Sequence, residues 1–132
     1  MANPNIVNVT QIYGTTTYYT PSGTSAVVLL TNASGSGKVL KINQIVAANV
    51  NGSAAVDTTV SIYTNGGVAQ GSAPSGGTAY PVVSTVSVPA DASLIVTDKT
   101  TAIYLEEDKC ISVTSGTASG ITYSISYEEI SS

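Results

Sequence analysis

The strongest constraint on the fold of this chain is an alternation of apolar and polar residues with a period of two. In the segment GITYSISYEEI (120–130), Ile121, Tyr123, Ile125 and Tyr127 take one side, and Thr122, Ser124 and Ser126 take the other. Successive side chains of a strand point to opposite faces, so the pattern indicates a half-buried β-strand. No 11-residue window carries the apolar stripe of an amphipathic helix. We therefore expect a fold built from strands.

Similar alternating or short apolar runs recur along the chain, separated by clusters of Gly, Pro, Asn and Ser. The run 25–31 is continuously apolar, as expected of a strand that is buried on both faces. The expected strands are 6–13, 25–31, 38–50, 58–64, 81–88, 93–97, 101–106, 109–115 and 120–130. The sets expected to face inward include Leu40, Ile42, Val46, Ala48 and Val50 in 38–50, and Val82, Val86 and Val88 in 81–88. Strands of this number and spacing predict an all-β fold, a single antiparallel β-sandwich or jelly-roll-like domain over residues 1–132.

One long segment has no strand pattern. Residues 65–79 (NGGVAQGSAPSGGTA) are rich in Gly, Ser and Ala, which bury little surface. We expect a flexible surface loop inside the domain, either a tether or a recognition tip, and we favour the tether.

The charge content excludes several classes of function. Only 9% of the residues are charged, the net charge is −4, and the four basic residues are all lysines. Nucleic-acid binders neutralise phosphates with Lys and Arg, so we expect no nucleic-acid partner. No apolar run is long enough to span a bilayer, and there is no basic amphipathic stretch, so no membrane partner is expected.

The compartment is inferred from the first residues and from cysteine usage. The opening MANPNIVNVTQIYG lacks the basic and apolar regions of a secretory signal. Cys110 is the only cysteine, so no disulfide within the chain is possible. We expect a protein that is made and folded in a cytoplasm.

Residue types required by common catalytic sites are missing. The chain has no histidine, which excludes Ser–His and Cys–His nucleophile pairs and zinc sites built from His and Cys. Cys110 is expected on the polar side of its strand, as a small residue in a serine-like place. The stretch SGSGK (34–38) lacks the Ser/Thr and the helix of a phosphate-binding loop, so we interpret it as a hairpin turn. No catalytic residue and no cofactor are predicted.

Four of the twelve charged residues are consecutive, at 106–109 (EEDK). Because the flanking runs 101–105 and 110–113 have inward-facing apolar residues, we expect a tight turn whose charges face solvent. Asp91 and Asp98 add oxygen donors, so weak calcium binding is the alternative. The spaced acidic loop of a calcium site is absent, and adjacent carboxylates on a turn cannot face one another across a substrate. We predict a structural turn and no metal site.

The run VSVPADASLIVTDKTTAIYLEEDKCISVTSG (86–116) resembles small structural proteins of tailed bacteriophages, especially marine cyanophages. Those proteins have a VPA-D/N turn before an apolar strand and an I/L-Y-L-E-E-G-D segment before the next. Residues 88–91 (VPAD) match the first motif, and 103–107 (IYLEE) with Asp108 match the second. The glycine is missing, so this loop is one residue shorter. The stretches NPNIVNVTQIYG (3–14) and LKINQIVAANVNG (40–52) are also similar to such proteins.

The resemblance implies a non-enzymatic virion component, made in the host cytoplasm, that decorates (cements) the capsid. Its partners would be the major capsid protein or other virion proteins. A homo-oligomer is expected, and the resemblance favours a trimer. A tail or fibre component is the nearest alternative, and a carbohydrate- or receptor-binding β-sandwich module is another.

Tyrosines are the candidate contact residues, because tyrosine offers contact area together with a polar group. Tyr13, Tyr18 and Tyr19 lie within residues 1–20, a possible N-terminal contact segment that carries no charge. We expect this segment to lie over a neighbouring molecule. Tyr63, Tyr123 and Tyr127 are instead expected in the core.

Overall fold

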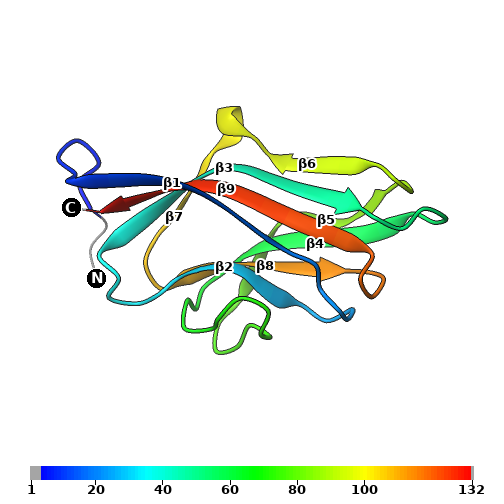
Figure 1. Cartoon of the computed structure of the whole chain (residues 1–132). Helices are drawn as coiled ribbons and strands as arrows, with labels where there is room; N and C mark the ends of the chain where they lie inside the picture. The colour runs from blue at the N-terminus through cyan, green and yellow to red at the C-terminus, as the bar shows by residue number, and fades with distance from the viewer. Residues whose placement is uncertain (1–3, 132) are drawn as a thin grey trace.

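A computed structural model describes residues 4–131 of the chain (Figure 1). Alternating apolar residues form strands, and Gly, Pro, Asn and Ser form the connections between them. The elements are β1 (Gln11–Tyr19), β2 (Val27–Asn32), β3 (Lys38–Asn49), β4 (Val56–Tyr63), β5 (Ala79–Val88), β6 (Ser93–Thr97), η1 (Lys99–Thr101), β7 (Ile103–Leu105), β8 (Lys109–Ser115) and β9 (Ile121–Ser131).

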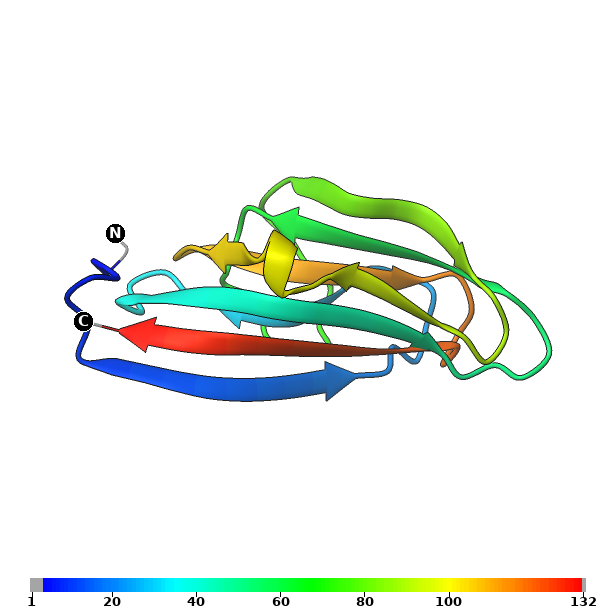
Figure 2. The same ribbon diagram turned by 90° about the horizontal axis from the view of Figure 1, so that it is seen from above.

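Two antiparallel sheets pack face to face. The first, sheet A, has the strand order β1-β9-β3-β6, and β7 also pairs with β3. The second, sheet B, has the order β2-β8-β4-β5. Figure 2 shows the two layers from above, with β1 at one margin of sheet A next to β9. The predicted all-β sandwich is confirmed.

The main core lies between the sheets. Leu29 and Ile111 of sheet B and Ile42, Ile125 and Tyr123 of sheet A are fully buried there. The hydroxyl of Tyr123 donates to the carbonyl of Thr114 at 2.9 Å and also pairs with the Thr58 hydroxyl. A tyrosine is tolerated at the centre of the core because its hydroxyl has partners. The expected burial of Tyr123 is confirmed.

A second, smaller apolar cluster lies on the other face of sheet B. Val28, Tyr63 and Cys110 are buried there, and Val68 packs against them. Val68 belongs to the connection between β4 and β5, which lies below β2 and β8 in Figure 1. β2 is therefore buried on both faces, as its continuous apolar run predicts.

A register shift in β3 reverses its inward face. The pairing of β3 with β9 shifts between Ile42 and Gln44. Leu40 and Ile42 face the core before the shift, and Ile45 and Ala47 face it afterwards. The prediction that Val46, Ala48 and Val50 face inward is therefore wrong, because one extra residue in a bulge changes the phase of the alternation.

Shifts of register also occur between β4 and β5. As a result Val83 packs against the core, whereas Val82 is exposed, which corrects the expected inward position of Val82.

The first expected strand is wrong in its first half, because the chain turns near Ile6 and Val7 and β1 begins at Gln11. The alternation there is too short to outweigh the turn.

Candidate interaction surface

β1 is an edge strand of sheet A. It pairs with β9 from Gln11 to Tyr19 in one unbroken register. Tyr13 is 53% exposed and Tyr18 is 72% exposed. Tyr19 is half-buried, packs against the main core and lies over Gly71. Of the three tyrosines predicted to make contacts, two are therefore presented to solvent and the third also anchors the strand.

The two faces of β1 differ in their surroundings. Thr17 and Tyr19 pair with Ile125 and Tyr123 of β9, so this face looks toward sheet B. The opposite face carries Ile12 and Tyr18 and looks away from the sandwich. Ile12 is exposed as well. β1 therefore places a large apolar or aromatic side chain near each end of its outer face.

The residues before β1 extend this exposed apolar surface. The amide of Thr10 donates to the carbonyl of Ser131 at 3.0 Å, which holds the segment beside the end of β9. Ile6 and Val7 are exposed. Ile6 also lines an open pocket of about 360 Å³ together with Pro4, Val39, Tyr104 and Glu106. Apolar contact surface thus runs from the N-terminal segment to β7.

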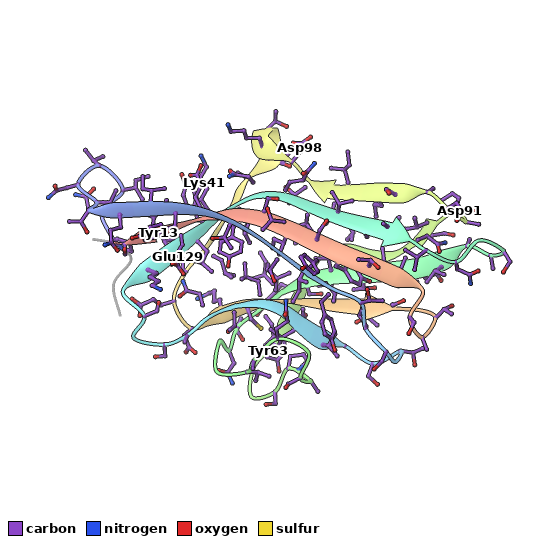
Figure 3. The ribbon with its side chains drawn as sticks, viewed as in Figure 1. Tyr13, Lys41, Tyr63, Asp91, Asp98 and Glu129 are labelled. Carbon is purple, nitrogen blue, oxygen red and sulfur yellow. The ribbon has the colours of Figure 1, made fainter. Side chains whose placement is uncertain are left out.

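Charge near β1 is locally balanced. Lys38 Nζ lies 3.1 Å from Glu129 Oε1, and Glu129 is the cross-strand partner of Tyr13. Figure 3 shows Tyr13 and Glu129 close together at the end of the molecule where β9 finishes. The chain carries no charged residue before Lys38. A partner that approaches β1 therefore meets a neutral strand.

The acidic run 106–109 does not behave as expected. Glu107 is only 6% exposed. Its carboxylate accepts hydrogen bonds from the amides of Gly35 at 2.9 Å and Gly37 at 3.2 Å. Both glycines have positive φ angles, which let successive amides point toward one anion. The stretch SGSGK does surround an anion, and the anion is a carboxylate of the same protein.

The prediction that all these charges face solvent is therefore wrong for Glu107, and the reason is topological. Residues 106–108 connect β7 of sheet A to β8 of sheet B, and residues 33–37 connect β2 to β3 in the opposite direction. The hairpin interpretation of 34–38 is wrong for the same reason. These two segments, each of which crosses from one sheet to the other, lie side by side at this end of the sandwich and are called the two crossings below.

Asn32 and Asp108 complete the junction of the two crossings. Asn32 Nδ2 donates to the carbonyls of Lys38 at 3.0 Å and Leu105 at 2.9 Å. The Asp108 amide donates to the Asn32 carbonyl at 2.8 Å, and Asp108 Oδ1 accepts from the Gly66 amide at 3.2 Å. The carboxylates of Glu107 and Asp108 are thus engaged by backbone amides of neighbouring loops.

The other acidic residues considered for calcium lie elsewhere. Figure 3 shows Asp91 and Asp98 apart from one another, with Asp91 in the turn before β6 and Asp98 directly after this strand. Asp98 accepts hydrogen bonds from Thr100, chiefly from its side chain, and these bonds hold the pKa of the Asp98 carboxyl below its usual value. Within residues 4–131 no three His, Cys, Asp or Glu side chains gather as a metal site.

Cys110 is buried in the second apolar cluster, so its expected serine-like, polar position is wrong. The segment between β4 and β5 covers this face of β8 and makes it interior. Burial raises the pKa of the Cys110 thiol to about 11. The thiol therefore stays protonated near neutral pH, which is unsuitable for a nucleophile.

The segment 65–79, expected to be flexible, makes specific contacts with β2. The Val28 amide donates to the Ser72 carbonyl at 2.9 Å, and the Gly71 amide donates to the Val28 carbonyl at 2.8 Å. Gln70 Nε2 donates to the Leu29 carbonyl at 2.8 Å. These bonds cover part of the free edge of β2.

Comparison with known proteins adds no assignment. No protein-family model matches the chain, and no curated protein matches it significantly. In the described part of the chain no helix is long and apolar enough to cross a membrane.

Proposed function

We propose that this chain is a non-enzymatic structural protein of a tailed-phage virion, a capsid decoration protein that binds the major capsid protein. The observation that carries the proposal is the neutral, exposed strand β1, with Tyr13 and Tyr18 accessible. Large aromatic side chains on an uncharged surface are typical of protein–protein contacts. The resemblance of residues 86–116 to phage structural proteins supplies the virion context.

The chemistry of the chain supports a binding role. It has no histidine, and its one thiol is buried. The buried carboxylate Glu107 is engaged by two backbone amides in a structural junction. A decoration protein needs a rigid, complementary surface and no reactive group. A chain without histidine, with a buried thiol and a structurally engaged carboxylate, fits this requirement.

The deciding experiment is mass spectrometry of purified virions, followed by cryo-electron microscopy to locate the copies. We expect the protein in the particle in many copies on the capsid shell. Virions that lack it would overturn the proposal, and density on the tail would reassign it to a tail or fibre component. In reconstitution on undecorated capsids, Tyr13→Lys should reduce occupancy, whereas Asp57→Ala, an exposed change on β4, should not.

A second candidate function is carbohydrate or receptor binding. The observation that favours it is the open pocket beside β7, where the exposed ring of Tyr104 lies near apolar side chains and the carboxylate of Glu106. Pockets that combine an apolar wall with few polar groups are common ligand sites. Glycan-array binding that disappears in Tyr104→Ala would support this candidate, and an array without signal would reject it.

A further inference from the structure

The four outer edges of the two sheets are protected to very different degrees. At the free edge of β2, the Val28 carbonyl accepts from the Gly71 amide and the Val28 amide donates to the Ser72 carbonyl. β5 contains Pro81, two shifts of register and the positive φ of Thr85. β6 has only five residues. Proline, irregular backbone, short length and coverage are the usual devices that prevent a sheet edge from pairing with another strand.

β1 has no proline, irregular backbone or short length, and segment 65–79 contacts it through inward-facing side chains, where Gln70 Nε2 donates to Thr17 Oγ1 at 3.2 Å and Tyr19 lies over Gly71. The strand has nine residues (QIYGTTTYY), no charge and no register shift. Within the described part of the chain, β9 is the only strand that pairs with it. Its outer edge therefore presents a regular row of backbone donors and acceptors. Such an edge is a template for one more strand.

We propose that the occupant of this edge is β1 of a second copy, paired antiparallel about a two-fold axis at Thr15. An antiparallel pair over residues 11–19 of both copies places residue i opposite residue 30 − i. Ile12 then faces Tyr18 of the second copy, and Tyr13 faces Thr17. Residues i and 30 − i are both even or both odd. The residues whose N–H and C=O groups point away from β9 therefore lie opposite one another in the two copies, as an antiparallel ladder requires.

The side chains of β1 suit this self-pairing. Aromatic residues opposite β-branched residues are among the stabilising cross-strand pairs, and both new pairs are of this kind. No like charges meet, because neither copy carries a charge before Lys38. A strand of another protein could use the same edge, but the near-symmetric order of large and small residues about Thr15 favours a second copy.

The interface is isologous and closes at two copies. It therefore predicts a dimer in place of the trimer that the resemblance implies. The two-fold axis is perpendicular to sheet A, so the sheet continues across both molecules. Edge pairing alone buries little surface, and we expect a dissociation constant on the order of micromolar.

Cysteine cross-linking of the purified full chain tests the register. Thr15 is opposite its own copy, so Thr15→Cys should form covalent dimers under mild oxidation. Tyr18→Cys should not link to itself, because the two copies of residue 18 would lie roughly 20 Å apart. A mixture of Ile12→Cys and Tyr18→Cys should link. Cys110 does not interfere, since it is buried. Equal linking of Thr15→Cys and Tyr18→Cys would overturn the register.

Analytical ultracentrifugation at tens of micromolar tests the dimer itself. We expect wild type to sediment as a dimer and Thr15→Lys, which sets two lysines against each other, as a monomer with unchanged circular dichroism. Thr117→Lys, an exposed change in the β8–β9 turn, should leave the dimer intact. A wild-type monomer, or a trimer that Thr15→Lys does not change, would overturn the proposal. Neither measurement involves a capsid, so the result is independent of the proposed virion function.

Discussion

At the scale of single residues, Glu107 shows how a local pattern can mislead. From the sequence, four charges between two apolar runs indicate a solvated turn, and Glu107→Ala would then change stability little. In the structure the carboxylate accepts from Gly35 and Gly37 and joins two crossings of the sandwich. The Gly-Ser-Gly spacing is a sequence signal for a loop that binds an anion. Its carboxylate partner could not be predicted, because Glu107 lies 70 residues from Gly37 in the sequence.

We therefore expect Glu107→Ala to lower the free energy of unfolding by about 2 kcal/mol, because a buried charged acceptor is removed and two amides lose their partner. Glu107→Gln keeps one acceptor oxygen and should cost less. The matched control is Asp57→Ala, at an exposed carboxylate, which should stay within about 0.5 kcal/mol. Urea unfolding measures all three, and equal values for Glu107→Ala and Asp57→Ala would contradict the structural role.

Two buried acids predict a loss of stability at alkaline pH. Burial raises the pKa of Cys110 from 9.0 to about 11 and that of Tyr123 from 10.0 to about 12. The folded state therefore holds these protons more tightly than the unfolded state. Their contribution is complete below about pH 9 and is lost as the pH rises through the folded values.

Urea midpoints measured from neutral to alkaline pH should stay level and then fall above about pH 9. Cys110→Ala should remove the part of the decline that occurs between pH 9.0 and about 11, while the part due to Tyr123 remains. A wild-type midpoint that stays constant throughout this range would refute the assignment.

At the scale of elements, most strands follow from alternation, because one buried face imposes a period of two. What alternation cannot show is where that period is interrupted. The bulge after Ile42 and the shifts between β4 and β5 reverse the inward face without any obvious sequence mark. The burial of Cys110 does not follow from alternation either, because it depends on a loop of Gly, Ser and Ala that packs across β8.

The contacts between segment 65–79 and β2 predict slow amide hydrogen exchange at one residue of each. Gly71 donates to the Val28 carbonyl, and Val28 donates to the Ser72 carbonyl. Both amides should exchange roughly tenfold or more slowly than those of Gly23 and Thr24, in the exposed connection before β2. Exchange measured by NMR decides this, and equal rates would favour the flexible loop expected from composition.

At the scale of the whole molecule, buried asparagines fasten both ends of the sandwich. Asn32 ties β2 to the carbonyls of Lys38 and Leu105 in sheet A. At the other end Asn49 Nδ2 donates to the carbonyls of Ala54 at 3.0 Å and Val88 at 2.8 Å. Each amide links the two layers where the chain crosses between them.

The N-terminal segment is part of the folded sandwich as well as a candidate contact surface. Residues 1–20 include β1, which pairs with β9 along its whole length, and Tyr19, which packs on the core. Deleting them would expose the edge of β9, so we expect the melting temperature to fall by roughly 5 °C or more. Thr15→Lys should melt within about 2 °C of wild type when both are measured at a concentration well below the dissociation constant of the dimer. Melting temperatures are measured by calorimetry. If the deletion variant and Thr15→Lys had similar melting temperatures, β1 would be dispensable for folding.

The bulge in β3 means that this strand contains two competing reading frames. Beyond Asn43, the residues Ile45 and Ala47 face the core, yet the alternate set of Val46 and Ala48 is equally apolar. Hydrophobicity alone would leave these frames nearly degenerate. Asn49 distinguishes the two frames, because in the native one its amide donates to the carbonyls of Ala54 and Val88, and a slip of one residue would turn its side chain to the other face. One polar residue thus selects the register of an apolar strand. Its loss would allow alternative registers before it lowered the overall stability of the fold.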